Sequence, residues 1–129
     1  MATATISFDA PDLAARVEQS SQFELDRLTF GVIQLDREGK VLFYSATEAK
    51  FSGFKELPLG SNYFTEPLCV NKREIHTRVL RAMEDGPFDL EFGWKGDRVS
   101  ADRELRIRVQ SSRNGGFWMF IERDVLPDA

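Results

Sequence analysis

The sequence contains one cysteine, one histidine and two tyrosines among its 129 residues. A single cysteine excludes an internal disulfide, and a domain without disulfides is typical of a reducing compartment, so we expect a cytoplasmic protein. A single histidine limits general acid–base catalysis, and the sequence has no cluster of metal ligands and no phosphate-binding loop. We therefore expect neither an enzyme nor a metal site.

Long apolar runs and an excess of positive charge are also missing. No run approaches the roughly 20 residues of a membrane-spanning helix, and the N-terminus lacks the basic start and apolar middle of a secretory signal. Seventeen Lys and Arg against twenty-one Asp and Glu give a net charge of −4. This balance argues against a general nucleic-acid binder, whose affinity depends on phosphate neutralisation. We expect no membrane and no nucleic acid among the partners.

Phenylalanine, by contrast, is frequent, with eleven residues. A core rich in aromatic rings suits the enclosure of a flat organic ligand, although ordinary core packing explains the composition equally well. The length of 129 residues fits one domain with one core.

Residues 1–28 look like a separate N-terminal segment. Within it, "PDLAARVEQ" predicts a short helix with Pro11 in its first turn. A second short helix is predicted over "SQFELDRL", with Phe23, Leu25 and Leu28 as its contacts. Helices this short are unstable alone, so we expect both to dock on the rest of the domain.

The stretch "LTFGVIQLDREGKVLFYS" contains two β-branched and aromatic runs joined by "DREG", which predicts a hairpin with Gly39 at positive φ. A short helix, "ATEAKFSGF", follows and is expected to end at Gly53. Residues 55–72 have no clear period, and loops of this length are often functional.

The longest helix is predicted over "NKREIHTRVLRAMEDG", with Asn71 as its cap and Gly86 at its end. Its apolar face holds Ile75, Val79, Leu80 and Met83. Three strands complete the chain: "FDLEFGW", then "ELRIRVQ", whose arginines are expected to face solvent, and "FWMFIERDV", which follows the turn "RNGG". An aromatic stripe in the first of these strands is expected to be sheet core that also lines a pocket, and it consists of Phe88, Phe92 and Trp94.

Two strands, short helices with a loop, one long helix and three strands imply an α+β domain with an antiparallel sheet and helices on one face. A five-stranded sheet in the order 2-1-5-4-3 meets this description, and it is the architecture of PAS domains. We expect an N-terminal cap over residues 1–28, the PAS core over 29–125 and a C-terminal tail over 126–129.

Four polar side chains are candidates for function, and each also has an ordinary structural explanation. Glu48 follows Tyr44 by four positions among small residues; alone it would be surface charge, and Tyr44 a core tyrosine with a backbone partner. Cys69 alone would be a buried structural thiol. His76, the only histidine, could bind haem in a PAS sensor, although a lone helix histidine is far more often a surface or capping residue.

The segment "LDRLTFGVIQLDREGKVLFYSATEAKFSG" resembles the opening of the photoactive yellow proteins, which are bacterial blue-light sensors with a PAS core. The family pattern is Leu-Asp-x-Leu-x-Phe-Gly-x-Ile-Gln-Leu-Asp, then a turn, a strand that ends in Tyr, and a Glu four residues later. The matching residues are Leu25, Asp26, Leu28, Phe30, Gly31, Ile33, Gln34, Leu35, Asp36, Tyr44 and Glu48. The stretches "GSNYF" and "FWMFIERDV" also resemble the family, and the likeness runs from about residue 10 to residue 125.

This resemblance implies a chromophore, 4-hydroxycinnamic acid (p-coumaric acid), bound as a thioester to Cys69. Tyr44 and Glu48 would then hydrogen-bond its phenolate, and Ser52 takes the place of a threonine that supports the tyrosine. Phe54 replaces a pocket-capping arginine of the family, so the shield against water is expected to be apolar. The other residues expected to line the pocket are Ile33, Tyr63 and Trp94.

The function that the resemblance implies is blue-light reception. Glu48 is expected to be neutral in the dark, because burial next to a negative oxygen disfavours its charged form. After trans–cis isomerisation Glu48 would give its proton to the chromophore, and the buried carboxylate would drive partial unfolding and release of the N-terminal helices. The receiver would be an unknown downstream signalling protein, and the chain a monomer or weak dimer. The alternative is a non-photoactive PAS module that binds a ligand or another protein.

Overall fold

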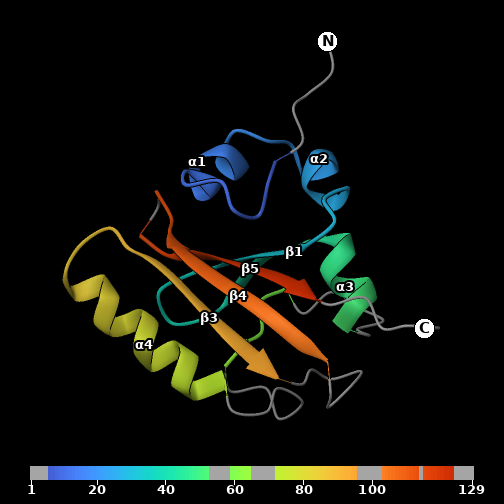
Figure 1. Cartoon of the computed structure of the whole chain (residues 1–129). Helices are drawn as coiled ribbons and strands as arrows, with labels where there is room; N and C mark the ends of the chain where they lie inside the picture. The colour runs from blue at the N-terminus through green and yellow to red at the C-terminus, as the bar shows by residue number, and fades with distance from the viewer. Residues whose placement is uncertain (1–5, 53–58, 65–71, 96–102, 114, 124–129) are drawn as a thin grey trace.

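The computed structural model describes residues 6–52, 59–64, 72–95, 103–113 and 115–123 (Figure 1). Two short helices come first, α1 (Leu13–Glu18) and α2 (Gln22–Asp26). The remaining elements are β1 (Gly31–Leu35), β2 (Val41–Tyr44), α3 (Ala46–Ser52), α4 (Lys72–Glu84), β3 (Asp89–Lys95), β4 (Glu104–Ser111) and β5 (Phe117–Arg123). Within the described residues, no helix is long and apolar enough to cross a membrane.

The five strands form one antiparallel sheet in the order β2-β1-β5-β4-β3. This confirms the α+β class and the predicted 2-1-5-4-3 order. The central pair joins the two ends of the chain, since Gly31 lies opposite Ile121 and Leu35 lies opposite Phe117. Residues from the N-terminal hairpin and from the last strand therefore meet in the middle of the sheet.

The β1–β2 hairpin has the predicted turn. The Asp36 carboxylate accepts hydrogen bonds from the backbone N–H groups of Glu38 and Lys40, at 3.0 and 2.8 Å. Gly39 has a φ of 95°, and a Cβ there would lie 2.6 Å from the Phe64 ring. Backbone conformation and crowding both favour glycine at this position.

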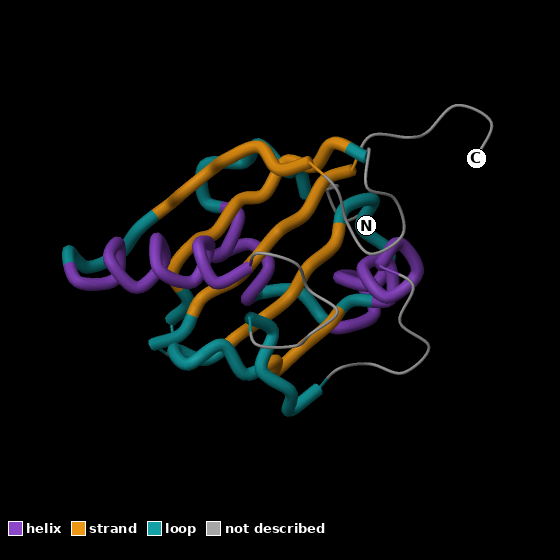
Figure 2. Tube along the Cα trace, turned by 90° about the horizontal axis from the view of Figure 1, so that it is seen from below, coloured by secondary structure: helices purple, strands orange, loops and turns teal. Residues whose placement is uncertain are grey.

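The sheet has a separate hydrophobic core on each face. On the face that we call the inner face, the core comprises Ile33, Leu35, Val41, Tyr44, Tyr63, Phe64, Ile75, Val79, Leu105, Ile107, Val109, Phe117, Met119 and Ile121. The opposite face packs against residues 6–28, which we call the cap, through Phe8, Leu13, Ala14, Val17, Leu25, Phe30, Val32, Trp118 and Phe120. The cap and α4 lie on opposite sides of the sheet in Figure 1, and Figure 2 shows α4 running across the sheet. The predicted boundaries at residues 28/29 and 125/126 stay predictions.

Helix α4 has the predicted amphipathic face. Ile75 and Val79 are buried in the inner core, and Met83 packs against it. The chain leaves the helix at Gly86, whose φ is 99°, as expected for a glycine that ends a helix. The predicted cap residue, Asn71, lies outside the described residues.

Three details of the sequence prediction are wrong. The β4 arginines do not both face solvent, because the cap covers that face and leaves Arg108 only 5% exposed. Phe23 was expected to be a helix contact but is 68% exposed. Pro11 precedes the N-cap residue Asp12 and therefore lies outside α1.

Candidate functional site

Tyr44 and Glu48 lie together on the inner face. Tyr44 is the last residue of β2, opposite Ile33 of β1, and α3 begins two residues later. Tyr44 is 2% exposed and Glu48 is 1% exposed, so Glu48 is not a surface charge. The Tyr44 hydroxyl donates a long hydrogen bond of 3.5 Å to Glu48 Oε2.

The first turn of α3 is fixed by a buried serine. Ser45 Oγ accepts hydrogen bonds from the backbone N–H of Val32, at 3.0 Å, and of Glu48, at 3.2 Å. Ser45 thus serves as an N-cap and at the same time ties the helix to β1. The backbone position of Glu48 is set by the central sheet.

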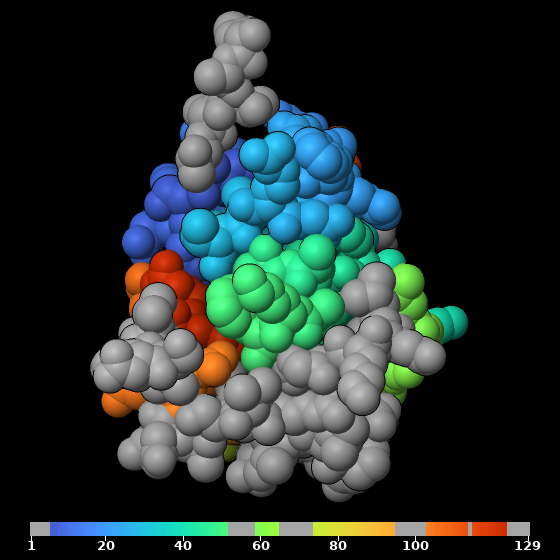
Figure 3. All heavy atoms as spheres, turned by 90° about the vertical axis from the view of Figure 1, so that its right-hand side faces the viewer, coloured from blue at the N-terminus to red at the C-terminus, as the bar shows by residue number. Residues whose placement is uncertain are grey.

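The same helix is also tied to the cap. Asp26 Oδ1 accepts a hydrogen bond from the Ala46 N–H at 2.7 Å. The Thr47 hydroxyl lies 2.6 Å from the carbonyl oxygen of Leu28 and 3.1 Å from that of Asp26. In Figure 3, α3 (green) lies directly below the cap (blue) and beside the end of β5 (red). A displacement of α3 would therefore disturb the attachment of the cap.

Gly31 provides the space in which the Glu48 carboxyl group lies. A Cβ at Gly31 would fall 1.8 Å from Glu48 Oε1 and 2.8 Å from its carboxyl carbon. A glycine is therefore required at this position of "FGVIQL" for a steric reason, which is the side chain of a residue 17 positions later.

Glu48 has a partner that the sequence prediction missed. Arg123, the last residue of β5, donates to Glu48 Oε1 at 2.6 Å and to Oε2 at 2.8 Å. The Arg123 side chain is only 6% exposed. The alternation in "FWMFIER" carried the signal, because Arg123 is in phase with Phe117, Met119 and Ile121, the buried residues of the inner face.

The other predicted pocket residues are only partly within the described chain. Ile33 and Tyr63 belong to the inner core together with Tyr44, and Trp94 packs against this core. Ser52 is the last residue of α3, but its side chain lies outside the described part of the structure. Phe54 and the predicted attachment residue Cys69 also lie outside the described residues.

His76 is half-buried against the Phe64 ring. The two rings stack with a centroid distance of 4.3 Å and an interplanar angle of 6°. His76 Nε2 lies 3.3 Å from the carbonyl oxygen of Arg37. This arrangement is that of a packed helix histidine. Among the described residues, no group of three or more His, Cys, Asp or Glu side chains could hold a metal ion.

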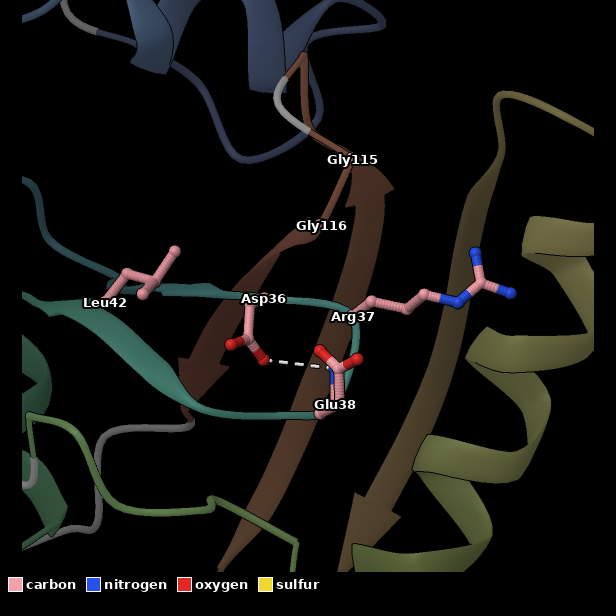
Figure 4. A pocket seen from close by; sticks show the side chains of 6 residues that line it. All are labelled: Asp36, Arg37, Glu38, Leu42, Gly115 and Gly116. Carbon is pink, nitrogen blue, oxygen red and sulfur yellow. Dashed lines mark hydrogen bonds between the residues drawn. The ribbon is translucent and has the colours of Figure 1, made fainter.

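Two clefts are present elsewhere in the described structure. One, of about 230 Å³, is formed by the tips of two hairpins and is lined by Asp36, Arg37, Glu38, Leu42, Gly115 and Gly116 (Figure 4). Its Asp36 carboxylate is already engaged by the backbone of its own turn. The other, of about 440 Å³, lies between the cap and the sheet near Glu18, Phe43 and Trp118. Neither cleft is lined by Tyr44 or Glu48.

The cap is attached to the sheet by buried polar groups. Arg108 donates hydrogen bonds to the carbonyl oxygens of Phe8, at 2.8 Å, and Ala10, at 2.6 Å. It also forms a two-pronged ion pair with Asp89. These hydrogen bonds from Arg108 lower the pKa of the Asp89 carboxyl group. Gln110 accepts from the Ala14 N–H at 2.6 Å.

Glu18 forms a second attachment of the cap. Its Oε2 accepts hydrogen bonds from Trp118 Nε1, the Arg113 N–H and the Ser112 hydroxyl, at 2.9, 2.9 and 3.1 Å. Burial alone would raise the pKa of Glu18, but these three donors outweigh burial and lower it. Glu18 therefore holds the end of α1 to the sheet as a carboxylate.

Comparison with known proteins gives the same relationship as the motifs. No protein-family model matches the chain. A photoactive yellow protein from Halochromatium salexigens is 26% identical over 92% of this chain and 97% of that protein. The photoactive yellow protein of Cereibacter sphaeroides is 29% identical over 91% of this chain and 94% of that protein.

Solved structures agree with this relationship. The photoactive yellow protein domain of the sensor histidine kinase Ppr from Rhodospirillum centenum has a TM-score of 0.68 and 27% identity, and the match covers 83% of this chain and 96% of that domain. A PAS domain of an HTR-like protein from Haloarcula marismortui, at 11% identity and a TM-score of 0.54, shares the fold alone. The chain has the PAS fold, and its sequence and structure are similar to those of photoactive yellow proteins.

Proposed function

We propose that this protein is a blue-light photoreceptor that carries a 4-hydroxycinnamoyl group as a thioester on Cys69. The observation that carries the proposal is the buried Tyr44–Glu48 pair on the inner face of a PAS sheet. The names of the relatives, photoactive yellow proteins, support it.

The described residues fit the chemistry of a phenol ligand. A buried phenolate is costly unless acidic O–H groups hydrogen-bond it. The Tyr44 hydroxyl and the Glu48 carboxyl group are both buried beside the inner core and can serve as these partners. A thioester requires a thiol, and Cys69 is the only cysteine of the chain.

When bound, the 4-hydroxycinnamoyl group supplies blue-light absorption and trans–cis isomerisation. Tyr44 and Glu48 would hold the phenol oxygen, and Glu48 would hold or give up a proton at its carboxyl group. Ile33, Phe54, Tyr63 and Trp94 would exclude water from this network, which would strengthen its hydrogen bonds. Ser52 would support Tyr44.

The signal would pass from Glu48 to the cap through α3. This helix is tied to β1 by Ser45 and to the cap by Asp26 and Thr47. A change in the contacts of Glu48 that moves the helix would therefore alter the hydrogen bonds that attach the cap. The cap helices have only six and five residues and depend on docking for their stability. Their partial release would be read by a separate signalling protein in the cytoplasm.

Reconstitution tests this function directly. Incubation with activated 4-hydroxycinnamic acid is expected to add one acyl group by mass spectrometry and to produce a visible absorption band. Cys69→Ala is the matched control and should show neither. A colourless, unmodified wild type would instead make the protein a PAS module that binds a ligand reversibly or pairs with another protein.

A further inference from the structure

We propose that Arg123 is the counter-ion of this site, and that it balances a single negative charge shared by Glu48 and the ligand's phenol. The part that concerns the ligand depends on the proposed function above. The part that concerns Glu48 applies to the chain without any chromophore.

The geometry is that of a guanidinium paired with a carboxylate. Two nitrogens of Arg123 reach the two oxygens of Glu48, at 2.6 and 2.8 Å, and both side chains are almost completely buried. Arginine presents its N–H groups in a planar fork that matches both carboxylate oxygens, and such pairs are stronger than neutral hydrogen bonds. In the chain without chromophore, Glu48 is therefore a carboxylate.

No other charge near Glu48 in the described structure takes this role. Tyr44 approaches from β2 with a neutral hydroxyl, and β1, from Gly31 to Leu35, has no charged residue. Lys50 of α3 is exposed. Glu122, the neighbour of Arg123 on β5, pairs with Arg106. The balance of charge at Glu48 thus depends on Arg123.

One buried positive charge fixes how many negative charges the site can hold. If Glu48 and the phenol were both ionised, one negative charge would remain uncompensated, which burial makes costly. If neither were ionised, the buried Arg123 guanidinium would lose the charge-assisted pair that it forms with Glu48. In the stable loaded state, Glu48 and the phenol therefore share one proton. When the phenol holds this proton, Glu48 is a carboxylate and is paired with Arg123.

This conclusion alters the expected consequence of proton transfer. A new carboxylate on Glu48 would not be isolated, because Arg123 is already within hydrogen-bond distance. Arg123 is also close to the Phe51 ring of the same helix, with its guanidinium carbon 6.0 Å from the ring centroid. The ion pair would therefore hold α3 against the end of β5.

Infrared spectroscopy of the protein without chromophore tests the Glu48 part. The spectrum of wild type minus that of Glu48→Gln should show a carboxylate band and no protonated carboxyl band. The same comparison is then made without the arginine. The spectrum of Arg123→Met minus that of the double variant Arg123→Met/Glu48→Gln should show a protonated carboxyl band, because the buried carboxylate has lost its counter-charge.

Three further variants separate charge from structure. Arg123→Gln removes the charge but keeps hydrogen-bond donors and should behave like Arg123→Met, which also covers the case that the methionine variant does not fold. Arg123→Lys keeps the charge and should show the carboxylate band. Arg78→Met breaks an exposed arginine–glutamate pair of α4 and should leave the Glu48 band unchanged. A protonated Glu48 in the wild type, or a carboxylate in both neutral variants, would overturn the proposal.

The loaded protein supplies a second, independent test. Loss of a positive charge next to the site should raise the pH at which the phenolate band appears by about one to three units in Arg123→Met. An unchanged midpoint would overturn the part of the proposal that concerns the ligand. If wild type takes up no chromophore, the photoreceptor function fails, whereas the infrared result still decides the role of Arg123.

Discussion

Gly31 allows the Glu48 carboxyl group to lie directly on β1, where Arg123 can reach it. A side chain at this position would occupy the volume of Glu48 Oε1. The position of the buried Glu48–Arg123 pair thus depends on a residue that contributes no functional group.

Gly31→Ala is expected to destabilise the fold by about 1–3 kcal/mol, the usual range for overpacking. The free energy of unfolding in urea measures this effect. Gly93→Ala is the matched control, because a Cβ at Gly93 meets no atom within 4 Å, and it should be neutral or slightly stabilising. Equal effects of the two substitutions would contradict the placement of Glu48.

Glu18 makes the attachment of the cap sensitive to acid. Its pKa is lowered in the folded state from an ordinary value of 4.5, so its contribution is complete above pH 4.5 and is lost as pH falls through the lowered pKa. We expect exchange of the Trp118 indole N–H, followed by NMR, to accelerate over this range in wild type.

Glu18→Gln provides the comparison for this pH dependence. It should show faster Trp118 indole exchange already at neutral pH and a smaller further change in acid. Asp12 and Asp89 also have lowered pKa values, so the test is the difference between the two proteins. Identical pH profiles would show that Glu18 does not hold the cap.

At the scale of elements, β4 has two different faces that the sequence pattern predicted only in part. Alternation correctly placed Leu105, Ile107 and Val109 on a buried face. Arg108 was assigned to solvent by the same alternation, because local periodicity does not tell which segment covers the other face, which also carries Gln110. Their partners in the cap are 96 to 100 positions away in the chain.

Arg108→Met should loosen the cap without unfolding the sheet. The carbonyl oxygens of Phe8 and Ala10 would lose a charged donor, and hydrogen bonds to charged groups contribute about 1.5–3 kcal/mol each at most. Hydrogen exchange by mass spectrometry should show faster exchange in residues 8–18 and little change in β1 and β5. Arg16→Met, which breaks an exposed pair within the cap, is the control. Uniform faster exchange would indicate global destabilisation instead.

At the scale of the whole molecule, local hairpins and alternation account only for strands that follow each other in the chain. The order 2-1-5-4-3, with its long-range pairing of β1 and β5, was predicted because the element order matches the PAS architecture. The buried state of Glu48 followed only from the family resemblance, since four neighbouring residues cannot distinguish a buried acid from surface charge. Arg123 was missed because its contact with Glu48 joins positions 75 residues apart. That contact exists only once β5 has paired with β1 in the observed register.

The two faces of the sheet therefore have different functions. The inner face holds Tyr44, Glu48 and Arg123, and the opposite face holds the cap through Glu18 and Arg108. Helix α3 contacts both, since it carries Glu48 and its Ala46 N–H donates a hydrogen bond to Asp26 of the cap. A change on the inner face can reach the cap without passing through the core.

The most direct test of the central claim is the absorption spectrum of the reconstituted protein before, during and after blue illumination. We predict a visible band that bleaches in blue light and returns in the dark, and that is absent from Cys69→Ala. A visible band that illumination leaves unchanged, or a wild type that stays colourless after reconstitution, would contradict it.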